Sequence, residues 1–95
     1  KLILDNQVSG GINITGDVEL SSIIDLTSHN INGVLTFTTA GTYSITDSTI
    51  EEVVNTSGGN VTIQSVNSFF NTLGANITVI NTKQFTFTVI GQTGY

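Results

Sequence analysis

Short runs of alternating apolar and polar residues follow one another along the whole chain, separated mainly by glycine, asparagine, serine and threonine. A period of two is typical of β-strands with one buried face, because successive side chains point to opposite sides of a sheet. No segment has the longer period of an amphipathic helix. We therefore predict one all-β domain over residues 1–95, with strands near 2–4, 12–15, 18–20, 23–26, 34–38, 42–46, 50–54, 60–66, 69–73, 76–80 and 85–90.

A repeat runs through these strands. Four equivalent turn positions are separated by 23, 26 and 24 residues, namely Gly10, Gly33, Gly59 and Lys83. Two residues after each turn stands an apolar residue: Ile12, Leu35, Val61 and Phe85. A polar residue comes next: Asn13, Thr36, Thr62 and Thr86. A second apolar residue completes the unit: Ile14, Phe37, Ile63 and Phe87.

A unit of about two dozen residues, with three strands and three corners, is typical of a β-solenoid. Each coil of a solenoid buries its inner face against the next coil, so equivalent residues form ladders. We therefore expect a short parallel β-helix of three to four coils, in which the second apolar column is one buried ladder. Strands spaced by turns also fit an antiparallel β-sandwich or jelly roll, and alternation alone does not separate the two folds. The columnar repeat favours the solenoid.

The composition excludes several classes of function. The two basic residues, Lys1 and Lys83, are too few to neutralise the phosphates of a nucleic acid, and the net charge is −5. No apolar run approaches the length of a membrane-spanning helix, and no signal-peptide pattern follows Lys1. Without cysteine there is no disulfide framework. We expect neither nucleic-acid binding nor membrane insertion.

Two segments carry a resemblance to known proteins. The runs 41–50 (GTYSITDSTI) and 55–63 (NTSGGNVTI) are similar to right-handed parallel β-helix segments of phage tail fibres, tailspikes and bacterial surface proteins. The resemblance covers about a quarter of the chain and contains no site motif, so it transfers no functional residue. It implies a parallel β-helix in an appendage on a virion or cell surface.

The residues that could carry chemistry are few. Glu51 and Glu52 are adjacent and are expected on opposite faces of a strand, which does not give the spaced carboxylate pair of a glycosidase. His29 stands alone among polar residues and is interpreted as a solvated turn residue. Asp47 with Glu51 is the nearest approach to a calcium site, and it supplies too few oxygens. We predict no catalytic residue, no metal site and no cofactor, and we do not expect an enzyme.

Sugars could be attached to this chain or bound by it. Four Asn-x-Ser/Thr motifs begin at Asn13, Asn55, Asn60 and Asn76. Asn55 is the best glycosylation candidate because it lies on a predicted corner. A glycan-binding site would need an aromatic platform beside polar groups. Tyr43 lies in an apolar column and is expected in the core, which leaves Tyr95 as the candidate glycan contact.

The open ends of a short solenoid set the functional expectation. Terminal coils expose unpaired backbone groups, and the last predicted strand has no charge or proline to block pairing. We expect self-association through both ends, at Leu2, Ile3, Leu4, Phe85, Phe87 and Val89. The chain would then be a structural module of an extracellular or virion fibre, forming a homotrimer or a filament. The alternative is a glycan- or receptor-binding module of a tail fibre or adhesin, with surface glycans as partners. A polysaccharide-degrading spike is disfavoured, since the acid pair is missing.

Overall fold

The computed structural model describes residues 1–8, 10–81, 87–89 and 93–94, with Asn81 and the last two ranges described by their backbone only. The strands are β1 (Leu2–Leu4), β2 (Asn13–Thr15), β3 (Val18–Leu20), β4 (Leu26–Thr27), β5 (Asn30–Phe37), β6 (Gly41–Thr46), β7 (Thr49–Asn55), β8 (Val61–Val66), β9 (Phe69–Leu73), β10 (Ile77–Asn81), β11 (Phe87–Val89) and β12 (Thr93–Gly94). No helix long and apolar enough to span a membrane occurs in the described residues. The predicted all-β class is confirmed.

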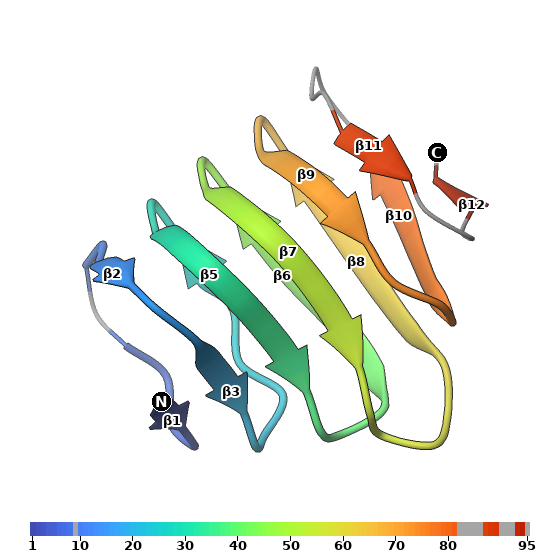
Figure 1. Ribbon diagram of the computed structural model, residues 1–95, viewed down its shortest axis with the longest axis horizontal. Coiled ribbons are helices and arrows are strands. Elements are labelled where there is room, and N and C mark those ends of the chain that lie inside the picture. Colours follow the sequence, from blue (N-terminus) through green and yellow to red (C-terminus); the bar gives the residue numbers. More distant parts are fainter. Residues whose placement is uncertain (9, 82–86, 90–92, 95) are drawn as a thin grey trace.

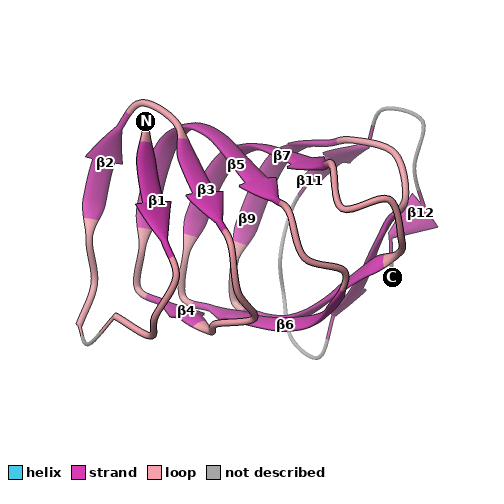
Figure 2. Ribbon diagram, turned by 90° about the horizontal axis from the view of Figure 1, so that it is seen from below, coloured by secondary structure: helices cyan, strands magenta, loops and turns pink. Residues whose placement is uncertain are grey.

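The strands form two sheets that face one another across the core (Figures 1 and 2). The seven-stranded sheet has the order β1-β3-β5-β7-β9-β11, and β2 also pairs with β5. The five-stranded sheet has the order β12-β10-β8-β6-β4. Successive strands of the chain alternate between the sheets from β5 onward, and each pairing in the described part is parallel. This is a parallel β-solenoid of about four turns, as predicted, and the antiparallel sandwich is excluded.

The length of a coil differs from the prediction. One row across the seven-stranded sheet has intervals of 16, 17, 18 and 20 residues, running through Leu2, Val18, Leu35, Val53 and Leu73. The expected pitch of about two dozen residues is therefore wrong. The coil is shorter because its corners are short: β6 and β7 are separated by Asp47 and Ser48 alone.

The predicted ladders are wrong for the same reason. Ile14 pairs with Ile31, Phe37 pairs with Leu20, and both pairs lie in the seven-stranded sheet. Ile63 lies in the five-stranded sheet between Tyr43 and Val79, and the backbone of Phe87 pairs with Phe70. The polar column is likewise split: Asn13 pairs with Asn30, Thr36 with Glu19 and Thr62 with Thr42, while Thr86 and Phe85 lie outside the described residues.

The core is filled by the inward side chains of the two sheets. The seven-stranded sheet supplies fully buried residues such as Leu20, Leu35 and Phe37, and the five-stranded sheet supplies residues such as Tyr43 and Ile63. The rings of Phe37 and Tyr43 meet across the core with their centroids 4.3 Å apart. Tyr43 is a core residue, as expected. Its hydroxyl donates a hydrogen bond to the Thr39 carbonyl, and burial raises its pKa.

A bend crosses the seven-stranded sheet and gives the coil a third side. In the first coil the bend separates β2 from β3, which are inclined to one another in Figure 2. Two glycines meet at the bend, since a Cβ on Gly33 would lie 2.0 Å from the carbonyl oxygen of Gly16. The Asp17 carboxylate accepts a hydrogen bond of 3.0 Å from the N–H of Val34 and so satisfies a backbone donor at the bend. Close backbone approach therefore requires glycine here.

A row of buried polar side chains lines the corner that follows the five-stranded sheet. The preceding residue has a positive φ in each coil, at Ser28, Asp47 and Asn67. The Ser48 hydroxyl donates to the Thr46 carbonyl at 2.9 Å and accepts from the N–H of His29 at 3.1 Å. We call His29, Ser48 and Ser68 the corner row. His29 is fully buried, so its interpretation as a solvated turn residue is wrong: the corner turns this side chain inward.

Candidate functional site

The first candidate surface is the free edge of β1. The N–H of Leu2 donates to the Asp17 carbonyl, and the Leu4 carbonyl accepts from the N–H of Ser21, both at 3.0 Å. Neighbouring residues of a strand direct their backbone groups to opposite sides, so the N–H and C=O of Ile3 point to the other edge. No strand of the described part pairs with that edge. The side chains of Leu2 and Ile3 are 42% and 57% exposed, which makes this edge apolar as well as unpaired.

The opposite end of the solenoid consists of β11 and β12. The backbone of β11 pairs with β9 and that of β12 pairs with β10, so each is the last strand of its sheet. Figure 1 shows β1 and β11 at opposite ends of the seven-stranded sheet. Phe87 and Val89 lie on β11, whereas Phe85 lies outside the described residues.

The five-stranded sheet ends differently at the N-terminal side. Its last strand, β4, has two residues, and Asp25 directly precedes it. The side-chain amide of Gln7 forms two hydrogen bonds with the backbone of Asp25: the amide oxygen accepts from the N–H at 2.9 Å, and Nε2 donates to the carbonyl at 2.6 Å. This edge is closed by a side chain that mimics a peptide group.

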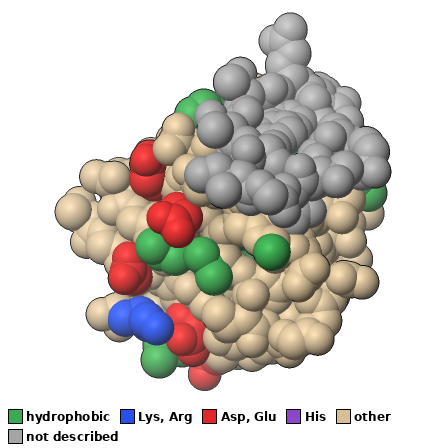
Figure 3. Space-filling view, turned by 45° about the vertical axis from the view of Figure 1, so that its right-hand side comes forward, with side chains coloured by type: hydrophobic (Ala, Val, Ile, Leu, Met, Phe, Trp, Pro, Cys, Tyr) green, Lys and Arg blue, Asp and Glu red, His purple; other side chains and the backbone are tan. Residues whose placement is uncertain are grey.

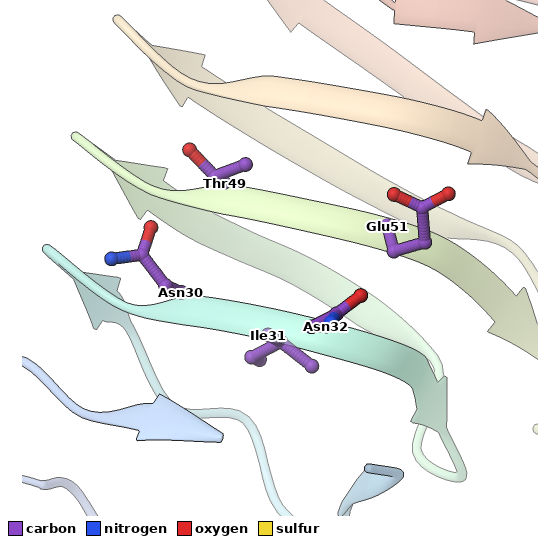
Figure 4. Close-up of a pocket in the computed structure, with 5 residues that line it drawn as sticks. All are labelled: Asn30, Ile31, Asn32, Thr49 and Glu51. Carbon is purple, nitrogen blue, oxygen red and sulfur yellow. The ribbon is translucent and has the colours of Figure 1, made fainter. Parts of the chain in front are cut away.

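The second candidate surface is a shallow hollow of about 160 Å³ on the outer face of the seven-stranded sheet. It is lined by Asn30, Ile31, Asn32, Thr49 and Glu51. In Figure 4 the polar side chains stand on one side of β5 and β7, while Ile31 points to the other side. The hollow therefore has a polar rim over a backbone floor.

Neighbouring residues extend this polar surface and add an aromatic ring. Asn30 donates to the Asn13 side chain at 2.8 Å, and Asn71 donates to the Glu51 carboxylate at 3.0 Å. Phe69 pairs with Thr49 in register and is half-buried between two buried neighbours, which places it on the outer face. An aromatic side chain beside amides and a carboxylate is a combination that binds sugars.

Glu51 and Glu52, the adjacent acidic pair, both lie outside the core. Glu51 is exposed and Glu52 is half-buried, and both flanking residues, Ile50 and Val53, are buried. The expectation of opposite faces is therefore wrong, because the bend interrupts alternation and keeps both carboxylates out of the core. Figure 3 shows acidic side chains spread around a small apolar group on one face. No group of three or more potential metal ligands occurs among the described residues.

The Asp47–Glu51 candidate is likewise divided between separate partners. The Asp47 carboxylate accepts a hydrogen bond from the Asn67 amide at 2.8 Å, and the Glu51 carboxylate accepts from Asn71. Each acid thus pairs with the next coil. These contacts are amide–carboxylate links along the stack and not ligands that converge on one point.

The sugar-related candidates occupy different environments. Asn55 is half-buried, and its Nδ2 donates to the carbonyls of Gly59 at 2.8 Å and Asn76 at 2.9 Å. Both amide hydrogens are therefore engaged, whereas Asn13, Asn60 and Asn76 are exposed. Tyr95 lies outside the described residues.

Two residues of these surfaces were missed from the sequence. Phe69 had a signal, since adjacent Phe69 and Phe70 cannot both face the core of a regular strand. Gln7 had none, because its contact with Asp25 joins two residues 18 positions apart that belong to no paired strand. No protein-family model, no curated protein and no solved structure matches the chain, so its likeness to other parallel β-helices concerns architecture alone.

Proposed function

We propose that this chain is a structural module that associates end to end with copies of itself, as a segment of an extracellular or virion fibre. The observation that supports this proposal is the free edge of β1, whose backbone and apolar side chains are both without cover in the described structure. Unpaired edges are natural sites of strand addition. A second copy is the simplest partner, because a parallel stack is extended by translation with no change of strand direction.

The two ends of the solenoid are compatible in this arrangement. β1 and β11 belong to the same sheet and run in the same direction, so β11 of one copy can add to β1 of the next. Addition would cover the exposed side chains of Leu2 and Ile3 and pair the backbone groups of Ile3. The net charge of −5 opposes the approach of two copies, and we expect salt to strengthen their association.

Sedimentation velocity over a concentration series tests the proposal. The wild-type chain should form concentration-dependent oligomers, and Ile3→Lys should shift them to monomer because a lysine at a strand edge blocks pairing. Ile23→Lys is the matched control, since Ile23 is also an exposed isoleucine, at 51% against 57% for Ile3, and it belongs to no strand. A wild-type chain that stays monomeric at every concentration, or an Ile3→Lys variant that assembles like wild type, would contradict the proposal.

A second function, glycan binding, is favoured by the hollow beside Phe69. We propose that a neutral sugar stacks on Phe69 and forms hydrogen bonds with the amides and carboxylate of Asn30, Asn32 and Glu51. Titration of ¹⁵N-labelled chain with neutral oligosaccharides should shift the amide signals of Asn30 and Thr49, and Phe69→Ala should abolish the shifts. Tyr95→Ala tests the sequence-based candidate in the same assay. Unchanged amide signals at the hollow would reject this function.

A further inference from the structure

We infer that Asn32 is a site of spontaneous covalent modification, where the backbone cyclises onto the side chain and the amide becomes a carboxylate. The inference goes beyond the proposed function and does not depend on contact between copies. Asn32 is followed by Gly33, and no other asparagine of the chain precedes a glycine. Glycine has no Cβ beside its backbone nitrogen and adopts many backbone conformations, so this nitrogen can approach the side chain of the preceding residue.

The reaction needs only the chain and water. The backbone nitrogen of Gly33 gives up its proton and attacks Cγ of Asn32. The N–Cγ bond forms, the Cγ–Nδ2 bond breaks, and Nδ2 takes up a proton and leaves as ammonia. Water then opens the cyclic imide: hydrolysis at Cγ leaves an aspartate in an ordinary backbone, and hydrolysis at the backbone carbonyl carbon leaves an isoaspartate, whose main chain runs through Cγ. Either product carries one additional negative charge, and nothing is oxidised or reduced.

The peptide link between Asn32 and Gly33 lies in a β-bulge. The register of β5 against β7 shifts between Ile31 and Val34, so Asn32 and Gly33 together oppose Glu51. Two residues against one is the arrangement that disrupts the regular ladder of a sheet. The link that must rotate for ring closure therefore lies outside the regular pairing with β7.

The Asn32 side chain is not held by a partner. It is exposed at the hollow and forms no hydrogen bond with another described residue. The neighbouring amides are engaged, since Asn30 donates to Asn13 and Asn71 donates to Glu51. Figure 4 shows Asn32 on the same side of the sheet as Glu51. A solvated amide can turn toward the backbone nitrogen, whereas a bonded amide must first lose its hydrogen bond.

The two products have different consequences for the coils. The Asn32 carbonyl accepts a hydrogen bond of 3.2 Å from the N–H of Gly16 and so joins the second coil to the first. Aspartate keeps this carbonyl in the backbone. In isoaspartate the same carbon belongs to a free carboxylate and the main chain gains a methylene group, next to Gly33, where even a Cβ would lie 2.0 Å from the Gly16 oxygen. We therefore expect only the isoaspartyl form to lose the contact between the bends of the two coils.

Mass spectrometry of the folded chain, incubated at mildly alkaline pH, tests the site. Fragments with Asn32 should be the first to gain the mass of an amide-to-acid change, and they should become substrates of an isoaspartyl methyltransferase. Asn32→Gln should abolish the change, because the longer side chain closes a larger and less favourable ring. Asn30→Gln is the matched control, at an exposed asparagine of the same strand, and should convert at Asn32 like wild type. A folded chain that keeps the Asn32 amide while the urea-unfolded chain loses it would overturn the inference.

Chromatographic separation of the two products provides the readout of their effect on the coils. The aspartyl product should unfold at the same urea concentration as an Asn32→Asp variant, and the isoaspartyl product should unfold at a lower one. Equal urea midpoints for the two products would overturn the inferred loss of contact at the bend, whereas the site itself stands or falls with the mass change at Asn32.

Discussion

The first coil, which contains β2, β3 and β4, differs from the two coils that follow it, which contain β5 with β6 and β7 with β8. Its strand in the five-stranded sheet has two residues, whereas β6 and β8 have six each. The corner row is also incomplete there, because Ile12 takes the position that His29 and Ser48 hold in the later coils. Backbone groups of the first coil bond instead to side chains, such as the amide of Gln7.

This difference implies that stability and association depend on different coils. In the central coils equivalent residues lie above one another, so each buried side chain and each backbone group has a partner in the coils on both sides. The first coil has a complete neighbouring coil on one side only, because on the other side β1 alone pairs with β3, and individual side chains serve as substitutes. We expect substitutions in the central coils to lower the free energy of unfolding most, and substitutions at the first coil to change assembly.

Truncation of side chains along one buried row should give the largest difference in the free energy of unfolding between the central coils and the N-terminal end of the stack. Leu4, Leu20 and Phe37 pair in register, and Phe37 is fully buried whereas Leu4 is half-buried at the end of the row. Phe37→Ala should lower the free energy of unfolding by about 3–5 kcal/mol, and Leu4→Ala by about 1 kcal/mol, since less apolar area and a smaller cavity are involved. Urea unfolding followed by circular dichroism measures both. Equal losses of stability in the two variants would contradict the prediction that the cost of truncation decreases from the centre of the row to its end.

A methyl group at the bend should have the next largest effect. The Cβ of Gly33→Ala would lie 2.0 Å from the Gly16 carbonyl oxygen, so the backbone of two coils must move, at a cost of about 1–3 kcal/mol or more. Gly10→Ala is the control in the first coil. Gly10 has a φ of 80° with nothing within 4 Å of a Cβ, so it should lose only about 1 kcal/mol, from backbone strain. A Gly10 variant less stable than the Gly33 variant contradicts the close approach at the bend.

Substitutions at the two corners of the central coils should differ by a smaller amount in the free energy of unfolding that they cost. Ser48→Ala removes the acceptor of the buried His29 N–H and should cost about 1–3 kcal/mol, the usual penalty for an unsatisfied buried donor. At the other corner the Thr56 N–H already bonds to the Phe37 carbonyl at 3.0 Å, and its hydroxyl lies 3.5 Å from the same oxygen. Thr56→Ala should therefore change stability by about 0.5 kcal/mol or less. Chemical denaturation of both variants measures the difference, and similar losses would remove the distinction.

Alkaline pH should have the smallest effect on stability, and this effect should report the burial of Tyr43 in the second coil. Burial raises the pKa of Tyr43 in the folded chain, so the unfolded chain loses this proton first as the pH rises. Stability should be unaffected below an ordinary tyrosine pKa of about 10 and should fall above it. Tyr43→Phe should remove this part of the decline, while Tyr95→Phe, a change at the other tyrosine, serves as the control. Urea midpoints between about pH 8 and pH 11 test this, and an unchanged decline in Tyr43→Phe would contradict it.

The sequence predicted most of the strands and the parallel solenoid, but it did not predict β12, the first half of β5 or the stacking register. Alternation at Tyr43 and Ile63 identifies their buried faces, yet both sheets carry the same inward–outward pattern, so strands of different sheets align equally well. This is how Phe37 was matched with Ile63. His29 was misplaced because a polar residue at a corner can turn inward when backbone groups of the coil need a partner. Contacts of loops such as that of Gln7 depend on three-dimensional closure and have no local signature.

The parallel register is tested most directly by nuclear Overhauser effects between backbone protons of neighbouring coils. Thr42, Thr62 and Thr78 pair in one row of the five-stranded sheet. The structure predicts cross-peaks between the α-proton or amide of Thr62 and those of residues adjoining Thr42 on one side and Thr78 on the other, in the pattern of parallel strands. Cross-peaks that connect Thr62 with Thr36 instead, or α-proton pairs typical of antiparallel strands, would contradict the stacked coils on which both proposals rest.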